Sequence, residues 1–352
     1  MAKRGPLNII SLDVPPQQDS LAKFLTQSGT FREGDLFVNK DGIRIVGNSG
    51  VDAPPPIKPL DDQISLADVD VIKVIGKGNN VIVQLVQHKW TNQFFALKVI
   101  HMNIQESDRK RTAKELEINR SLECPYVVAC YQCFYQNNAF YLILEYMDGG
   151  SLLDFLRKVR TIPEDHLAAI CKQVVKGLHY LHHQKHVIHR DLKPSNLLIN
   201  HLGEVKITDF GVSAIVASTS AQANTNVGTY YYMGPERFSE ETYGARSDIW
   251  SLGMVMLECA TGKFPYAIPD DGWAATYYSV MQTIIEQPPP RASPDEFSPE
   301  FCSFISSCLQ KDPKARLSAQ QLLEHPFLSM YDDLAIDLAS YFTNDGSPLT
   351  TL

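Results

Sequence analysis

The stretch His189-Arg-Asp-Leu-Lys-Pro-Ser-Asn196 decides how the rest of the chain is interpreted. It places a carboxylate at Asp191, an ammonium group at Lys193 and an amide at Asn196. A carboxylate can orient an attacking hydroxyl and accept its proton, a lysine can neutralise phosphate charge, and an amide oxygen can hold a magnesium ion. The combination predicts a phosphoryl-transfer site. The alternative is a solvated loop after a helix, which the length of the pattern disfavours.

Composition and charge limit the class of protein. With 352 residues, 44% of them hydrophobic, the chain suits one large two-lobed globular domain with tails. Its formal net charge of -8 argues against a nucleic-acid partner, since such binding draws on clustered Lys and Arg. The sequence shows no signal-peptide core, no apolar run long enough to span a membrane and no Met-Gly start for myristoylation. We therefore expect a cytoplasmic protein, with the nucleus as a second compartment.

The seven cysteines lack the spacing of a disulfide framework, so we expect reduced core residues. Cys130 and Cys133 form a lone C-x-x-C pair. No second pair of cysteines or histidines completes a zinc-type site in the sequence, so we interpret both as ordinary strand residues.

The N-terminal residues 1–65 are rich in Pro, Gly, Ser and Asp and show no sustained apolar period. This predicts a flexible extension with little fold of its own. Within it, Lys3 and Arg4 precede Leu7 and Ile9, which would face the same way on an extended strand. Such an element could dock a partner with an acidic patch beside an apolar groove, and a disordered tail is the alternative.

Three β-rich apolar runs, at 71–75, 83–86 and 94–100, predict an antiparallel sheet. A glycine-rich turn lies between the first two, and Gly76 and Gly78 would let backbone amides approach phosphate oxygens. Val81 stands at the third glycine position of the glycine-rich nucleotide-binding loop pattern. A plain hairpin is the alternative interpretation of this turn. Ala96 and Lys98 share one face of the third run, so Lys98 could reach the α- and β-phosphates while Ala96 and Val83 cover the base. The predicted nucleotide-binding residues here are Ile75, Gly76, Lys77, Gly78, Asn79, Asn80, Val81, Ile82, Val83, Ala96 and Lys98.

Residues 107–123 form a charged, helix-like segment that should supply a carboxylate partner for Lys98. The inward position expected for Leu116 favours Glu115, and Glu117 is the competing candidate. For either residue, an exposed helix charge is the alternative. Asn119 is polar where an apolar anchor would hold the helix in place.

The run 141–150 is a buried strand that passes into a linker. We expect Leu144 behind the adenine and backbone contacts to the nucleotide from Glu145 to Met147.

The second half of the chain turns helical. Apolar residues at i, i+3, i+4 and i+7 predict a long core helix that delivers the 189–196 stretch: Leu167, Ile170, Cys171, Val174, Val175, Leu178 and Leu181. Asp209, within Thr-Asp-Phe-Gly, is predicted to hold a metal ion together with Asn196. Glu236 should form a structural ion pair with Arg316, and Asp248 should support the backbone of the 189–196 stretch.

These residues, from Gly76 to Arg316, resemble the protein-kinase pattern, and the chain resembles the mitogen-activated protein kinase kinases, especially those of plants. The narrower resemblance rests on His186-Val-Ile-His-Arg-Asp191, Phe-Gly-Val-Ser213 and Val227-Gly-Thr-Tyr-x-Tyr-Met-x-Pro-Glu-Arg237. It implies an α+β bilobal fold with an antiparallel sheet in the N-terminal lobe, one main helix beside it and a mostly helical C-terminal lobe. The expected units are an extension (1–65), an N-terminal lobe with hinge (66–149), a C-terminal lobe (150–330) and a tail (331–352).

The resemblance also implies an activity. An ATP- and Mg²⁺-dependent kinase of this family phosphorylates Thr and Tyr in the activation loop of a downstream mitogen-activated protein kinase. An upstream kinase switches it on, and the spacing typical of plant members selects Thr219 and Thr225, with Ser218 and Ser220 as neighbours. Arg190 could bind the resulting phosphate.

Three departures from the pattern put turnover in doubt: Val81, Asn119 and Gly234. They leave a catalytically weak or inactive scaffold as the alternative. Every charged catalytic position is nevertheless filled. An inactive scaffold would have no need of the whole set, which favours an enzyme: Lys98, Glu115, Asp191, Asn196 and Asp209. A small-molecule kinase of the same fold is disfavoured by the Pro-Glu-Arg ending of the activation segment.

Overall fold

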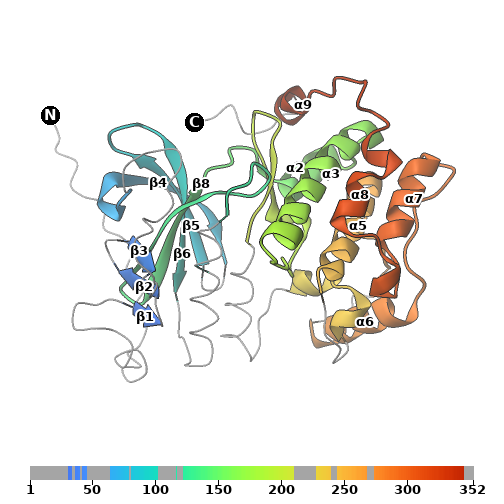
Figure 1. Ribbon diagram of the computed structural model, residues 1–352, viewed down its shortest axis with the longest axis horizontal. Helices are drawn as coiled ribbons and strands as arrows, with labels where there is room; N and C mark the ends of the chain where they lie inside the picture. Colours follow the sequence, from blue (N-terminus) through green and yellow to red (C-terminus); the bar gives the residue numbers. More distant parts are fainter. Residues whose placement is uncertain are drawn as a thin grey trace.

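The computed structural model describes residues 64–78, 81–101, 116, 122–209, 227–238, 244–267 and 273–344, together with the backbone of three short strands between residues 31 and 45. The chain forms a sheet-based N-terminal lobe and a mostly helical C-terminal lobe (Figure 1). This arrangement confirms the predicted α+β bilobal fold class.

A five-stranded antiparallel sheet with the order β4-β5-β6-β8-β7 makes up the N-terminal lobe. The strands are β4 (Val69–Lys77), β5 (Val81–His88), β6 (Phe94–His101), β7 (Cys130–Gln136) and β8 (Ala139–Glu145). The central strand β6 is buried from Phe95 to Ile100, as expected for a β-branched and aromatic run covered on both faces. Cys130 and Cys133 both lie on β7, which confirms their interpretation as strand residues.

The expectation of little fold within residues 1–65 is wrong for residues 31–45. Their backbone forms an antiparallel meander of β1 (Phe31–Glu33), β2 (Leu36–Asn39) and β3 (Gly42–Ile45). The backbones of β2 and β3 lie against β7 of the large sheet. The predicted docking residues Lys3, Arg4, Leu7 and Ile9 lie outside the described residues.

The C-terminal lobe is built around the predicted core helix. Its described helices are α2 (Leu152–Val159), α3 (Glu164–His179), α5 (Arg246–Thr261), α6 (Trp273–Glu286), α7 (Pro299–Cys308), α8 (Ala319–Leu323) and α9 (Leu338–Asn344). The apolar residues predicted on α3 are all buried, and the helix continues as a π-helix over Tyr180–Gln184. None of the described helices is both long and apolar enough to cross a membrane.

Helix α5 passes through the middle of this lobe, with every residue from Ser247 to Leu257 buried. It ends at Gly262, whose backbone is left-handed with φ +70°. A Cβ atom there would lie 2.5 Å from the carbonyl oxygen of Arg160, so glycine is required on both counts.

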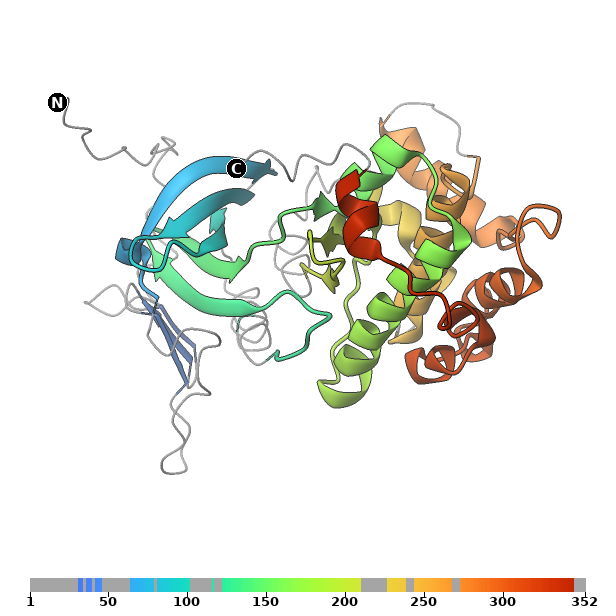
Figure 2. The same ribbon diagram turned by 90° about the horizontal axis from the view of Figure 1, so that it is seen from above.

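The expected tail contains a docked helix. Phe342 of α9 is fully buried, and its ring lies 5.2 Å from that of Phe155 on α2. The view from above shows α9 over the α2 and α3 side of the C-terminal lobe (Figure 2). The folded unit therefore extends at least to this helix.

The 189–196 stretch, which we call the catalytic stretch, is joined to a small sheet. The sheet has the order β11-β10-β9 and consists of β9 (Gly150–Ser151), β10 (Leu197–Ile199) and β11 (Val205–Ile207). The 189–196 stretch leads directly into β10, and Asp209 follows β11 by two residues. Antiparallel pairing of β10 with β11 thus places Asn196 and Asp209 at the same end of the sheet.

The predicted pair of Glu236 and Arg316 is confirmed. Arg316 is 1% exposed, and its two terminal nitrogens each donate to one Glu236 carboxylate oxygen at 2.7 Å. Burial raises the pKa of Glu236, but the bonds to Arg316 outweigh it and lower the pKa below its usual value. A Cβ atom at Gly234 would lie 2.6 Å from this carboxylate, so the glycine leaves room for the buried pair.

Arg316→Met should lower the free energy of unfolding by about 3–5 kcal/mol, because it leaves the Glu236 carboxylate buried without its partner. Guanidinium unfolding followed by circular dichroism measures the change. Arg291→Met, at an exposed position, is the matched control and should change little. A loss below about 1 kcal/mol in the Arg316 variant would contradict this assignment.

Candidate active site

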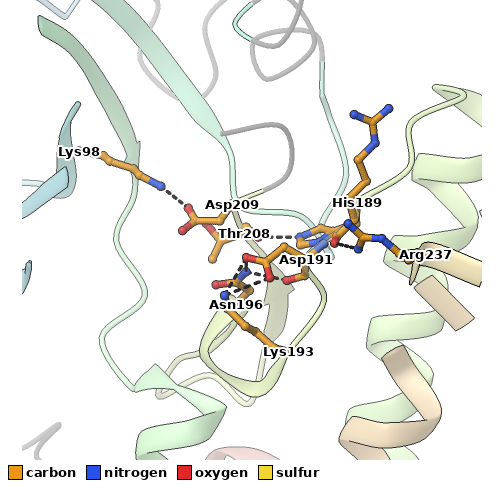
Figure 3. A network of polar contacts seen from close by, with 9 residues as sticks. Lys98, His189, Asp191, Lys193, Asn196, Thr208, Asp209 and Arg237 are labelled. Atoms are coloured by element: carbon orange, nitrogen blue, oxygen red, sulfur yellow. Dashed lines mark hydrogen bonds and ion pairs between the residues drawn. The ribbon is translucent and has the colours of Figure 1, made fainter. Parts of the chain in front are cut away.

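The Lys193 and Asn196 side chains meet at Asp191 (Figure 3). Lys193 Nζ lies 2.8 Å from Asp191 Oδ2, and Asn196 Nδ2 donates to the same oxygen at 3.0 Å. The Asn196 amide also donates to the Asp191 backbone carbonyl at 2.7 Å. The predicted base, cation and amide therefore form one bonded cluster, with the Asp191 side chain 9% exposed.

His189 orients the peptide that carries Asp191. Its Nε2 atom lies 2.8 Å from the backbone carbonyl of Thr208, and a carbonyl can only accept. We therefore assign the proton to Nε2, which leaves Nδ1 to accept the backbone N–H of Asp191 at 3.2 Å. The imidazole thus joins the catalytic stretch to the strand end that precedes Asp209.

Asp248, at the start of α5, supports the catalytic backbone as predicted. Its two carboxylate oxygens accept the backbone N–H groups of His189 at 2.8 Å and Arg190 at 2.9 Å. His182, in the π-helix, lies 2.8 Å from Asp248 Oδ2. Burial raises the pKa of Asp248, but the bonds to His182 and the backbone outweigh it and lower the pKa.

Sequence reasoning missed His182. A single histidine in a helical pattern is a weak sequence signal, because its partner Asp248 lies 66 positions further along the chain. His182 lies in a π-helix, a geometry often found at functional sites, and its side chain reaches Asp248 from there.

Lys98 and Asp209 face each other from the two lobes. Lys98, on β6, is 4% exposed, and its Nζ lies 2.6 Å from Asp209 Oδ1. Burial raises the pKa of Asp209, but the Lys98 ammonium, with His189 and Lys193 nearby, lowers it on balance. Asp209 also has a left-handed backbone with φ +65°, a conformation that non-glycine residues adopt mainly where the surroundings impose it.

The glycine-rich turn lies between β4 and β5. The N–H of Gly78 donates to the carbonyl of Val81 at 2.7 Å, which closes the turn. Val81, which stands where the pattern has a third glycine, begins β5 and pairs with Ile100 on β6. The valine is therefore part of the sheet. Ile75, Gly76 and Lys77 end β4, and Ile82 and Val83 continue β5.

The predicted base-binding residues come together across neighbouring strands. Ala96 on β6 pairs directly with Leu144 on β8, while Val83 pairs with Lys98. Met147 follows in the hinge and is 4% exposed. Besides the docking residues, these predicted residues lie outside the described ones: Asn79 and Asn80 of the turn, Glu115 and its alternative Glu117, Asn119, and the phosphorylation candidates Thr219 and Thr225.

A second interlobe ion pair was not anticipated from the sequence. Lys206 Nζ, on β11, lies 2.5 Å from Glu145 Oε1 at the end of β8. The other Glu145 oxygen accepts the backbone N–H of Ala129 at 3.2 Å. Both carboxylate oxygens of Glu145 are thereby bonded within the protein. The nucleotide contact predicted for Glu145 would therefore come from its backbone.

The donor set fits a hard divalent cation. Asp209 offers a carboxylate, and the Asn196 amide nitrogen bonds Asp191, which leaves its oxygen as the side-chain atom suited to a metal. Within the described ranges, no group of three or more His, Cys, Asp or Glu side chains could hold a metal ion. A cation bound by Asn196 and Asp209 would therefore need further ligands, which phosphate oxygens commonly supply.

Comparisons with known proteins agree with this geometry. Residues 69–328 match the protein kinase domain family. The chain is 67% identical over 340 residues to mitogen-activated protein kinase kinase SIPKK of Nicotiana tabacum, covering 96% of this chain and 95% of that protein. It is 60% identical to mitogen-activated protein kinase kinase 2 of Arabidopsis thaliana, over 100% of this chain and 98% of that protein.

A third relative is less similar but also covers nearly the whole chain. Mitogen-activated protein kinase kinase 1c of Physcomitrium patens is 50% identical over 94% of this chain and 96% of that protein. With a kinase domain over most of its length and such identity over nearly the whole chain, this protein belongs to the mitogen-activated protein kinase kinase family.

Proposed function

We propose that this protein transfers the γ-phosphate of ATP to a threonine and a tyrosine in the activation loop of a downstream mitogen-activated protein kinase. The observation that carries the proposal is the bonded cluster of Asp191, Lys193 and Asn196 beside the Lys98–Asp209 pair. The near full-length identity to mitogen-activated protein kinase kinases supports this substrate class.

Asp191 would act as the general base. Its backbone is fixed through His189 and Asp248, and its carboxylate is held by two donors, so it can orient the substrate hydroxyl and accept its proton. Lys193, already within 3.0 Å of both carboxylate oxygens, can move its charge toward the transferred phosphoryl group.

Lys98 and Asp209 would hold the phosphate end of the nucleotide. Kinases bind ATP with divalent metal, and we propose Mg²⁺ as the ion, held by Asn196 and Asp209, because carboxylate and amide oxygens are hard ligands. The bound ion would neutralise charge on the β- and γ-phosphates. Lys98 would then contact the α- and β-phosphates from β6 of the N-terminal lobe.

The structure offers no support for an inactive scaffold. Two of the three departures from the kinase pattern lie within the described residues, and the structure accounts for both. Val81 begins β5, and Gly234 makes room for Glu236. Lys98, Asp191, Asn196 and Asp209 lie in bonded pairs, Lys98 with Asp209 and Asn196 with Asp191. A decayed site would have no reason to keep them together.

We further propose an upstream kinase of the same cascade as activator, acting on Thr219 and Thr225, and a cytoplasmic location with the nucleus as a second compartment. The family membership supports the activator, and the composition supports the location. The docking role of Lys3, Arg4, Leu7 and Ile9 stays a prediction, as does the pairing of Glu115 with Lys98.

Asp191→Ala should lower kcat for phosphate transfer to a kinase-inactive mitogen-activated protein kinase by about 10²–10⁴-fold, because the base and its orientation are both lost. ATP affinity, measured by calorimetry, should stay nearly unchanged. Asp295→Ala, at an exposed position, controls for the loss of a carboxylate. A fully active Asp191 variant would remove the proposed mechanism.

Replacing Thr219 and Thr225 together by Ala should abolish activation by an upstream kinase, while paired acidic replacements should give partial constitutive activity. A phosphate adds about -1.5 to -2 charge and three acceptor oxygens, more than a carboxylate supplies. Mass spectrometry of the activated protein checks the sites. Full activity with phosphate only on Ser218 or Ser220 would show that the switch is assigned to the wrong residues.

A further inference from the structure

The backbone of Arg190, the residue before Asp191, has an unusual conformation. Arg190 has φ +73°, in the left-handed region that side chains with a Cβ atom disfavour. Such a conformation persists only where surrounding contacts fix it. Because Asp191 is the next residue, whatever fixes this peptide also sets the direction of the catalytic carboxylate.

Contacts from Asp248, His189 and Arg237 hold the two peptide groups that flank Arg190. The N–H of Arg190 donates to Asp248 Oδ1 at 2.9 Å, and the N–H of Asp191 donates to His189 Nδ1 at 3.2 Å. The remaining group is the carbonyl of Arg190, which accepts a hydrogen bond from the Arg237 guanidinium (Figure 3). Both ends of the peptide bond that carries Asp191 are therefore bonded, and Arg237 supplies the contact at the carbonyl end.

Arg237 reaches this carbonyl from a rigid base. It lies in the short helical turn η5 (Pro235–Phe238), and its own N–H donates to the carbonyl of Gly234 at 3.0 Å. Its neighbour Glu236 is fixed by the buried pair with Arg316. The end of the activation segment is thus anchored in the core of the C-terminal lobe and holds the catalytic peptide through one side chain.

We infer that Arg237 is a positioning residue for phosphoryl transfer: it fixes the Arg190–Asp191 peptide and so aims the Asp191 carboxylate at the substrate hydroxyl. The inference rests on the proposed function. It assigns Arg237 no contact with ATP or with the reacting atoms. A guanidinium suits the task because a charge-assisted bond to a carbonyl is stronger than a neutral one.

The test compares Arg237→Met and Arg237→Lys with the wild type in the full-length chain, each phosphorylated by an upstream kinase to equal occupancy as shown by mass spectrometry. Steady-state phosphate transfer to a kinase-inactive mitogen-activated protein kinase gives kcat, KM for ATP and KM for the protein substrate. Thermal unfolding reports the stability of each variant. Arg157→Met is the control for loss of a cation, since that side chain is 69% exposed.

We expect Arg237→Met to lower kcat by about ten- to hundred-fold, as a misplaced catalytic group does, with KM for ATP within about twofold and Tm nearly unchanged. Arg237→Lys should recover part of kcat, because its ammonium can donate to the same carbonyl from a slightly shorter side chain. Should Arg237→Met not fold, a reduced kcat with an unmoved Tm in Arg237→Lys supports the inference in its place.

Three results would overturn the inference while the wild type remains active. They are a wild-type kcat in Arg237→Met, a rise in KM for the protein substrate alone, which would make Arg237 a substrate contact, and a loss of activity that follows Tm in both variants. A wild-type protein that transfers no phosphate would instead overturn the proposed function, so the two failures can be told apart.

Discussion

The catalytic stretch depends on one buried carboxylate. Asp248 is 1% exposed and accepts two successive backbone N–H groups of residues 189 and 190, while His182 bonds it from the π-helix. An isolated buried charge is costly, so these donors must all be in place for the fold to tolerate it. The requirement works in both directions: α5 fixes the catalytic backbone, and the catalytic backbone satisfies the charge at the start of α5.

Two ion pairs then connect the lobes around this fixed point. Lys98 on β6 meets Asp209 beyond β11, and Glu145 at the end of β8 meets Lys206 within β11. The first pair brings together the side chains that would handle phosphate and metal. The second joins the end of β8 to β11 of the C-terminal lobe. A change in the orientation of the lobes would therefore alter both pairs at once.

Much of this could be predicted where residues act through local pattern. The burial of α3 followed from its apolar period, and the roles of Asp248 and Glu236 with Arg316 followed from motifs that resemble the kinase pattern. His182, Lys206 and Arg237 could not be assigned, because the contact that matters for each joins it to a residue 47 to 66 positions away. No local spacing records such a contact.

The meander at residues 31–45 and helix α9 were missed for a related reason. Strands of three or four residues in a segment rich in turn formers lack a sustained period, and the packing of α9 rests on a few apolar side chains such as Phe342. Both segments are stabilised by surfaces that other parts of the chain provide. Their structure is therefore a property of the assembled lobes.

A dual-specificity site acts on both a threonine and a tyrosine of one substrate loop. Mass spectrometry of a kinase-inactive mitogen-activated protein kinase, sampled over time with the activated protein, ATP and Mg²⁺, tests it most directly. We expect phosphate on both the threonine and the tyrosine of the substrate's activation loop. Phosphate on neither residue, or on serine and threonine alone at complete reaction, would contradict it.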